Sequence, residues 1–139
     1  MPMTLFVAGG ALALVLISHY WTLWGLAFLT PADDAGNHRR SLVMLLLLAS
    51  SHLVHIGAYA VLFYALIGIG GWGGFEKGVE SASDLFYASA TAYTTLGFAT
   101  NAPEGPLRLV AVLEGLAGFM ALTWSATFIY SAFRSTWRH

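Results

Sequence analysis

A string near the middle of the chain, Thr94-Thr95-Leu96-Gly97-Phe98-Ala99, has residue types suited to coordinating a cation with main-chain oxygens. A ring of such strings can replace the hydration shell of a dehydrated cation with its own carbonyl groups. This chemistry requires that the string lies at membrane depth and lines an aqueous path. Non-helical backbone at that depth is tolerated only where protein or water surrounds it.

The other candidate residues for chemistry are ionisable groups inside apolar stretches, namely His19, His52, His55 and Glu114. At about 1.5 Å per residue, His19 lies level with His52, and His55 lies level with Glu114, so we expect these to be two interacting pairs. His52 and His55 are three residues apart, which places them on one helix face. The histidines can make the protein respond to pH, carry protons or ligate Zn²⁺ or Cu²⁺, although they lack a compact metal-ligand motif. We favour neutral histidines that each make one interhelical hydrogen bond.

The composition is typical of a membrane protein, since 58% of the 139 residues are hydrophobic and only 9% are charged. Cysteine is absent, which excludes disulfides and thiolate chemistry. Three apolar stretches exceed the roughly 20 residues that a membrane-spanning helix needs, and they cover residues 4–29, 41–69 and 107–133. The first stretch lacks a basic region before it and is too long for a signal peptide, so we expect a retained span.

The basic residues predict how the spans are oriented. Arg39 and Arg40 lie between the first two stretches, and Arg134 and Arg138 follow the third. Basic loops stay in the cytoplasm, so we expect a multi-pass protein of the cell membrane with its N-terminus outside and its C-terminus cytoplasmic. The segment 70–106 is then outside, and its excess of acidic residues should concentrate cations there.

The segment between the second and third stretches predicts a short helix that enters the membrane and returns. Ser83 and Asp84 have the character of a helix N-cap and an acid in the first turn. The helix expected over 83–94 is too short to span, and a glycine-rich outer loop precedes it. The candidate string and Pro103 follow it.

This order of elements resembles the pore domain of the potassium channel family, whose filter reads Thr-x-Gly-Tyr/Phe-Gly after a short pore helix. Thr95, Leu96, Gly97 and Phe98 match that pattern, Thr94 flanks it, and Gly118 falls where many members carry a hinge glycine. The resemblance covers residues 82–133. It implies a tetramer around one pore, to which each chain contributes a quarter of the filter, and it implies that the carbonyls of residues 95–98 bind dehydrated K⁺.

The chain departs from the family pattern at the outer end of the filter. Ala99 replaces the last filter glycine, and Thr100 replaces the acid that usually follows. That glycine commonly has φ > 0, which costs alanine roughly 1–2 kcal/mol. Thr91 stands where some members have a carboxylate on the pore helix, and we expect Glu114 to support the filter by bonding Thr91. A weakly braced outer filter predicts reduced K⁺/Na⁺ discrimination, fast inactivation or a non-conducting resting state, and the sequence does not choose among these.

The predicted fold is an all-α membrane protein with three transmembrane helices, a re-entrant pore helix and a filter. Residues 1–41 form an extra N-terminal helix with a cytoplasmic loop, and residues 42–139 form the pore domain. Within that domain we expect an outer helix over 42–69, an outer loop over 70–82, a pore helix over 83–94, a filter over 94–99 and an inner helix over 107–133.

The predicted function is a K⁺-permeable cation channel and not an enzyme, because no catalytic constellation is present. A weakly selective or Na⁺-permeable channel is one alternative. A non-conducting membrane protein that uses its histidines for metal or protons, or that serves as a partner subunit, is another. We expect a homotetramer in contact with membrane lipid, no nucleic acid, and no cofactor other than the permeant K⁺.

Overall fold

The computed structural model describes residues 2–29, 38–98 and 101–133. This part of the chain contains α1 (Pro2–Phe28), α2 (His38–Gly68), α3 (Ala82–Tyr93) and α4 (Leu107–Phe133). By length and composition, α1, α2 and α4 can each cross a membrane. With 12 residues, α3 is too short to do so. The prediction of an all-helical fold with three spanning helices and one short helix is confirmed.

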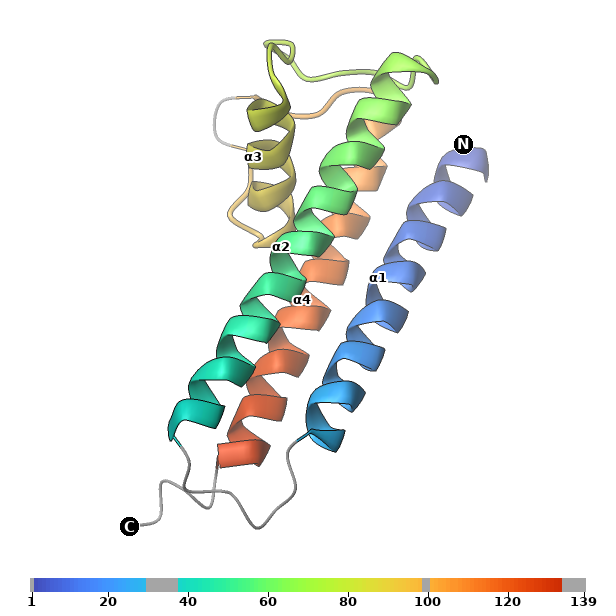
Figure 1. The fold of residues 1–139 in the computed structure, drawn as a ribbon. Coiled ribbons are helices and arrows are strands. Elements are labelled where there is room, and N and C mark those ends of the chain that lie inside the picture. The colour runs from blue at the N-terminus through green and yellow to red at the C-terminus, as the bar shows by residue number, and fades with distance from the viewer. Residues whose placement is uncertain (1, 30–37, 99–100, 134–139) are drawn as a thin grey trace.

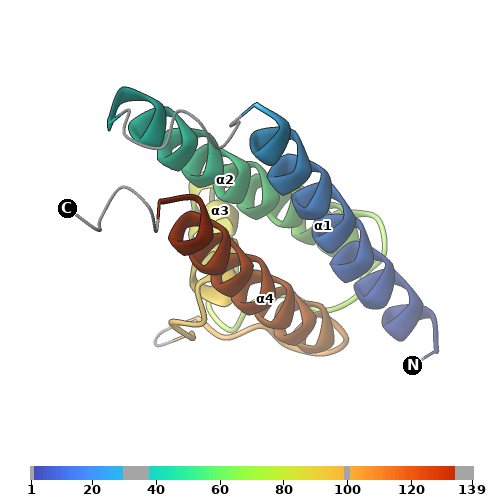
Figure 2. The same ribbon diagram turned by 90° about the horizontal axis from the view of Figure 1, so that it is seen from below.

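The pair α2 and α4 forms the centre of the molecule, with α1 on one side and α3 on the other (Figure 1). Seen from below, the three long helices run alongside one another, and α3 lies behind them (Figure 2). The short helix lies beside the C-terminal half of α2, and its own C-terminus points toward the middle of the bundle. After α3 the chain turns back and reaches α4 at the end of the molecule where α3 began.

The start of α3 differs from the predicted one. The N-cap is Ser81 and not Ser83, which lies inside the helix. The Ser81 hydroxyl accepts the N–H of Asp84 at 3.3 Å, and the Asp84 carboxylate accepts the N–H of Ser81 at 2.9 Å, which completes a capping box. The carboxylate also accepts the N–H of Glu80 at 3.0 Å, and these bonds, that from Glu80 foremost, lower the pKa of Asp84. Sequence reasoning placed the cap too late because it chose Ser83, the serine directly before Asp84. A capping box instead pairs the acid with the serine three residues earlier, which is Ser81.

The other predicted boundaries differ from the observed ones by a few residues. The second long helix begins at His38 and ends at Gly68, where 42–69 was expected, and α3 ends at Tyr93, one residue before the predicted end. Thr94 is the C-cap of α3. The inner helix has the predicted bounds.

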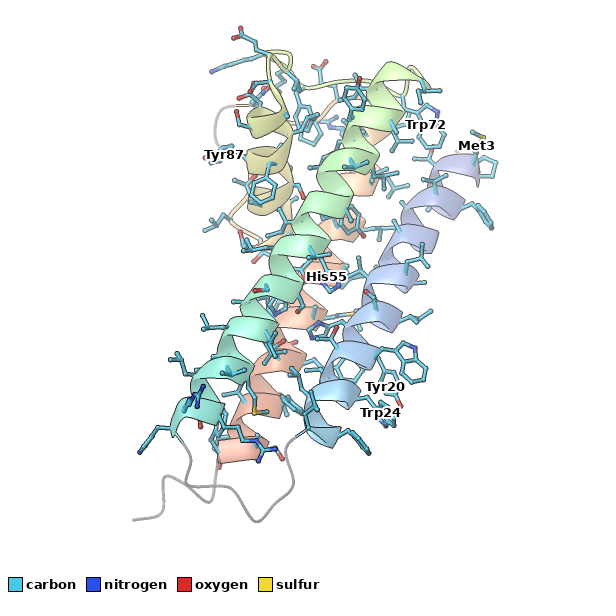
Figure 3. All side chains as sticks on the ribbon, viewed as in Figure 1. Met3, Tyr20, Trp24, His55, Trp72 and Tyr87 are labelled. Carbon is cyan, nitrogen blue, oxygen red and sulfur yellow. The ribbon has the colours of Figure 1, made fainter. Side chains whose placement is uncertain are left out.

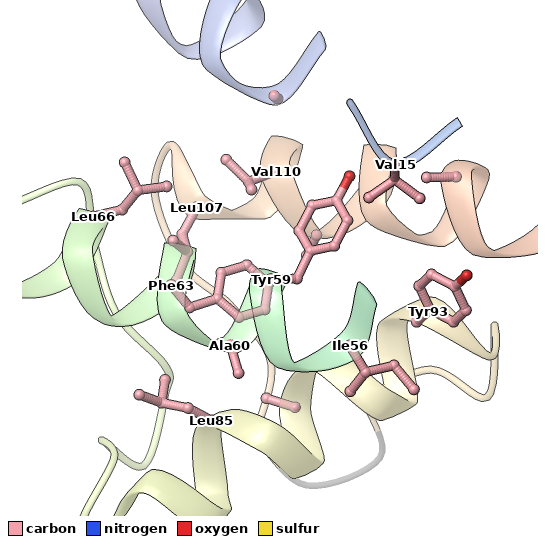
Figure 4. Packing of buried hydrophobic residues seen from close by; sticks show 14 of the residues in the cluster. Val15, Ile56, Tyr59, Ala60, Phe63, Leu66, Leu85, Tyr93, Leu107 and Val110 are labelled. Atoms are coloured by element: carbon pink, nitrogen blue, oxygen red, sulfur yellow. The ribbon is translucent and has the colours of Figure 1, made fainter. Parts of the chain in front are cut away.

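The upper core is formed by aromatic side chains of α2 packed against aliphatic side chains of α3 and α4 (Figure 4). Tyr59 and Phe63 are buried against Val110 and Leu107 of α4. Leu85 of α3 packs against the other side of α2 in the same cluster. Small residues dominate the buried face of α4, which holds Ala111, Ala117, Gly118, Ala121 and Ser125. Because lipid is as apolar as these side chains, helix association here depends on close van der Waals contact, which small residues permit.

Gly118 marks the closest approach of α4 to α3. A Cβ atom at this position would overlap the carbonyl group of Tyr93, and a Cβ at Gly115 would lie 3.2 Å from the carbonyl oxygen of Ala92. The sequence left open whether these glycines mark a bend or a close approach, and the structure shows the close approach. A gating hinge at Gly118 remains a prediction.

We predict that Gly118→Ala lowers the free energy of unfolding by about 1–3 kcal/mol, because the added methyl group must displace the backbone of Tyr93. Gly57→Ala is the matched control, since a Cβ at this helical position meets nothing within 4 Å. The control should be neutral or gain roughly 0.5–1 kcal/mol. Thermal unfolding in detergent measures both variants, and equal stability of the two would contradict the packing role of Gly118.

Candidate ion pathway

The chain leaves α3 through a backbone reversal at residues 94–97. Thr94 donates its N–H at 3.0 Å and its hydroxyl at 2.6 Å to the carbonyl of Ala90. Thr95 and Gly97 then adopt left-handed conformations, with φ of 60° and 82°. The N–H of Gly97 reaches back to the carbonyl of Thr91 at 3.2 Å. The predicted filter is therefore folded back against the last turn of α3.

The main-chain oxygens of the predicted filter are available for coordination. Among the residues that the structure describes, no backbone hydrogen bond ends on a carbonyl group of residues 95–98. Thr95, Leu96 and Gly97 are exposed, and Leu96 keeps 80% of its surface accessible. Free and exposed carbonyl oxygens must bind water or a cation, which is the chemistry expected of these residues. Ala99 and Thr100, which flank the filter in the prediction, lie outside the described residues.

Thr95 carries conformational strain that the sequence did not reveal. A β-branched residue at positive φ is a rare outlier, and such strain persists where the surrounding structure imposes it and is concentrated at functional sites. Sequence reasoning considered positive φ only at position 99, because that is where the family pattern has its last glycine.

The segment after the filter is attached to the outer loop by the side chain of Asn101. Its Oδ1 accepts the N–H of Lys77 at 2.8 Å, and its Nδ2 donates to the carbonyl of Gly78 at 2.9 Å. The ring of Phe98 also lies beside that of Phe75, with 6.2 Å between centroids. The sequence did not predict this brace, because Asn101 and its partners are 24 and 23 residues apart along the chain.

The support expected from Glu114 and Thr91 is arranged differently. The Thr91 hydroxyl donates to the carbonyl of Ala88 at 2.8 Å, so the predicted bond from Glu114 to Thr91 is wrong. Glu114 contacts α3 through Ser89 instead, with Oε1 2.5 Å from the Ser89 hydroxyl. Thr91 contacts the predicted filter by its main chain, through the bond from Gly97.

The Ser89 contacts determine the protonation of Glu114. The Ser89 hydroxyl lies 2.7 Å from the carbonyl of Ile56 and 2.5 Å from Glu114 Oε1, yet it has one proton for two acceptors. Both contacts can be hydrogen bonds only if the Glu114 carboxyl group is protonated and donates to the Ser89 oxygen, while the Ser89 hydroxyl donates to the Ile56 carbonyl. Glu114 is fully buried, and its Oε2 has no partner among the described residues. A neutral carboxyl group satisfies this arrangement, whereas an unpaired buried charge would be costly.

Below the filter, polar side chains from all four helices meet around Tyr93, the last residue of α3. The buried Tyr93 hydroxyl lies 2.9 Å from His52 Nδ1 and 3.2 Å from His55 Nδ1. Ser18 of α1 and Ser125 of α4 contact the other nitrogens of these rings, Ser18 at 3.0 Å from His55 Nε2 and Ser125 at 3.0 Å from His52 Nε2. We call this set, completed by His19 of α1, the histidine junction. Figure 3 shows His55 at the middle of the bundle.

The histidine pairings expected from depth counting are half correct. His19 and His52 do lie together, with ring centroids 5.1 Å apart. The pair His55–Glu114 is wrong, because the two nitrogens of His55 face Ser18 and Tyr93. The interhelical hydrogen bonds that we favoured for these histidines are present. Sequence reasoning did not single out Tyr93 or Ser18, since a tyrosine and a serine in apolar stretches carry no distinctive signal.

Comparison with known proteins identifies the class. Residues 51–135 match the family model Ion_trans_2, described as an ion channel family. The match extends from the middle of α2 to the end of α4 and covers more than half of the chain, so the chain belongs to this family of ion channel pore domains. Together with the three long apolar helices, this makes it a multi-pass membrane protein. No curated protein and no solved structure matches the chain significantly.

We predict that Glu114→Gln leaves the free energy of unfolding nearly unchanged, because the amide is neutral and can still bond Ser89. Glu114→Ala should lose about 1–3 kcal/mol, since it removes the contact between α3 and α4. Thermal unfolding of both variants checks this. A large loss for Glu114→Gln would show that the carboxyl group is needed in its charged form.

Proposed function

We propose that the protein is a K⁺-permeable channel in which four copies of residues 95–98 surround one central pore. The observation that carries the proposal is the string 95–98 at the end of a short helix. Its carbonyl groups accept no backbone hydrogen bond within the described part of the chain, and residues 95–97 are exposed. One chain supplies a single filter string, whereas a dehydrated cation needs oxygens on all sides. A ring of four copies provides them, and this number follows the potassium channel family that the filter string resembles.

The direction of α3 supports this function electrostatically. The partial negative charge at the C-terminal end of a helix stabilises cations nearby, and α3 ends one residue before Thr94 and the filter. Acidic side chains lie at the opposite end, where Asp84 caps α3 and Glu76 and Glu80 precede it. Negative charge near the mouth of the proposed pore raises the local concentration of cations there.

We further propose that the protein lies in the cell membrane with the filter opening outside and the C-terminus in the cytoplasm. Arg39 and Arg40 at the start of α2 lie at the end of the bundle opposite to α3. Arg134 and Arg138 follow α4 in the sequence, and α4 itself ends at that end of the bundle. The positive-inside rule places that end in the cytoplasm.

The first test is cation flux into liposomes that contain the pure full chain. We predict K⁺ uptake above that of empty liposomes and above Na⁺ uptake, and we predict that Gly97→Ala abolishes it. The left-handed φ of 82° at Gly97 costs alanine about 1–2 kcal/mol in each chain. Gly25→Ala is the control, because this helical glycine of α1 has open space around it. Equal K⁺ and Na⁺ uptake would support the weakly selective alternative, and wild-type uptake by Gly97→Ala would contradict the filter assignment.

A second prediction concerns Ala99, the position where the filter string departs from the family pattern. Ala99→Gly should raise the ratio of K⁺ to Na⁺ uptake, because glycine restores the residue that adopts φ > 0 at no steric cost. The same flux assay measures this ratio. An unchanged ratio would show that position 99 does not take part in selectivity.

A further inference from the structure

We infer that His19, His52 and His55 form a binding site for a borderline divalent transition-metal ion such as Zn²⁺. One ligand nitrogen from each histidine lies within 4.8 Å of the ligand nitrogens of the other two. His19 and His55 are buried and His52 is half-buried, and the three come from α1 and α2. Imidazole is a preferred ligand of Zn²⁺, Cu²⁺ and Ni²⁺, whereas Mg²⁺ and Ca²⁺ prefer oxygen.

The hydrogen bonds of the histidine junction specify one tautomer for each neutral ring. The Ser18 hydroxyl donates to the carbonyl of Val15 at 2.9 Å, so it must accept the proton of His55 Nε2. His55 Nδ1 then carries a lone pair and accepts the proton of the Tyr93 hydroxyl. The Tyr93 oxygen in turn accepts from His52 Nδ1.

The same reasoning continues to the other end of the junction. His52 Nε2 carries a lone pair and accepts the proton of the Ser125 hydroxyl, whose oxygen accepts from His19 Nε2 at 3.1 Å. On this assignment His19 Nδ1 carries a lone pair, and it has no hydrogen-bond partner among the residues that the structure describes. A fully buried nitrogen without a donor is costly, and a metal ion is a group that can satisfy it.

The geometry assigns the ligand atoms. Each Nε2 atom faces a serine hydroxyl, Ser18 for His55 and Ser125 for both His19 and His52. Metal-bound histidines donate their second N–H to such a group, which fixes the orientation of the ring. We therefore take the Nδ1 atoms as the ligands. On binding, His52 moves its proton from Nδ1 to Nε2, where the Ser125 oxygen accepts it. The Ser125 hydroxyl proton then turns away from His52 to the main chain of its own helix, as serine hydroxyls in helices commonly do.

The Tyr93 oxygen is placed as the fourth ligand. It binds as a phenolate, because its proton loses the acceptor His55 Nδ1 and is released to solvent when the ion binds. In a tetrahedral zinc site with bonds of about 2.0–2.1 Å, neighbouring ligand atoms lie about 3.3 Å apart. The Tyr93 oxygen is 2.9 Å from His52 Nδ1 and 3.2 Å from His55 Nδ1, which is close to that spacing. The bound ion would connect α1, α2 and the end of α3.

The position of Tyr93 links this site to the pore. Tyr93 immediately precedes Thr94 and Thr95, and Gly118 of α4 packs against its carbonyl group. An ion that holds the Tyr93 oxygen therefore restrains the base of the filter. This effect on conduction rests on the proposed function, whereas metal binding does not.

Metal binding is tested by titrating the pure, chelator-treated full chain in detergent with Zn²⁺ in a calorimeter. We expect one Zn²⁺ per chain, a Zn²⁺-dependent rise in melting temperature, and the visible absorption of tetrahedral Co²⁺ when Co²⁺ replaces Zn²⁺. His19→Ala should abolish all three signals. Ser125→Ala should weaken affinity by about tenfold, because it removes the hydroxyl that orients two rings.

His38→Ala is the matched control, since this exposed histidine at the start of α2 lies far from the junction. It should bind Zn²⁺ as the wild type does. No saturable Zn²⁺ binding by wild-type protein, or binding that persists in His19→Ala, would overturn the metal site. Melting temperatures without metal verify that each variant is folded.

The link to conduction is tested separately by K⁺ uptake into liposomes with and without Zn²⁺. Uptake should change with Zn²⁺ in wild-type protein and in His38→Ala, and not in His19→Ala. Zn²⁺ binding without a change in uptake would overturn the link and leave the metal site in place. If wild-type protein carries no K⁺ at all, the proposed function fails while the calorimetric result still decides the metal site.

Discussion

Non-helical backbone can lie inside a bilayer only where protein or water surrounds it, and the rest of this structure depends on that constraint. The C-terminal end of α3 carries residues 94–98 to the middle of the bundle, where residues 94–97 stay exposed in the single chain. Under the proposed function, further copies of the chain and the water of the pore surround them. Tyr93 holds this end in place with a fully buried ring and a hydroxyl shared by two histidines. The absence of side-chain atoms at Gly118 allows α4 to reach the Tyr93 carbonyl.

Inside a bilayer, buried polar groups need hydrogen-bond partners, and in this chain they gather in two places. The histidine junction collects hydroxyl and imidazole groups from all four helices, where each can serve as donor or acceptor for another. Glu114 and Ser89 form a second set between α3 and α4. Both sets contact α3, so the helix that carries the filter string is positioned by directional bonds as well as by packing.

The end of the string at Phe98 is held in a different way, by contacts with the segment that precedes α3. Asn101, Phe75 and Phe98 connect the segments on both sides of α3 through an amide bridge and an aromatic contact. An anti-parallel bridge between Phe75 and Pro103 extends this connection. The family pattern suggested a weakly braced outer filter, yet Asn101 and Phe75, which lie outside the family motif, brace this end of the string.

The sequence by itself determined the elements: three helices long enough to span, one helix too short to do so, and a filter string after it. Length and apolar content decide these features locally, so they can be read without neighbours. Only the tertiary structure decided the partners, as Glu114 with Ser89, His55 with Ser18 and Tyr93, and Asn101 with the outer loop show. Counting residues gives the depth of a side chain along a helix axis. The rotation of each helix about that axis, which selects the partner, is set by packing against helices distant in the sequence.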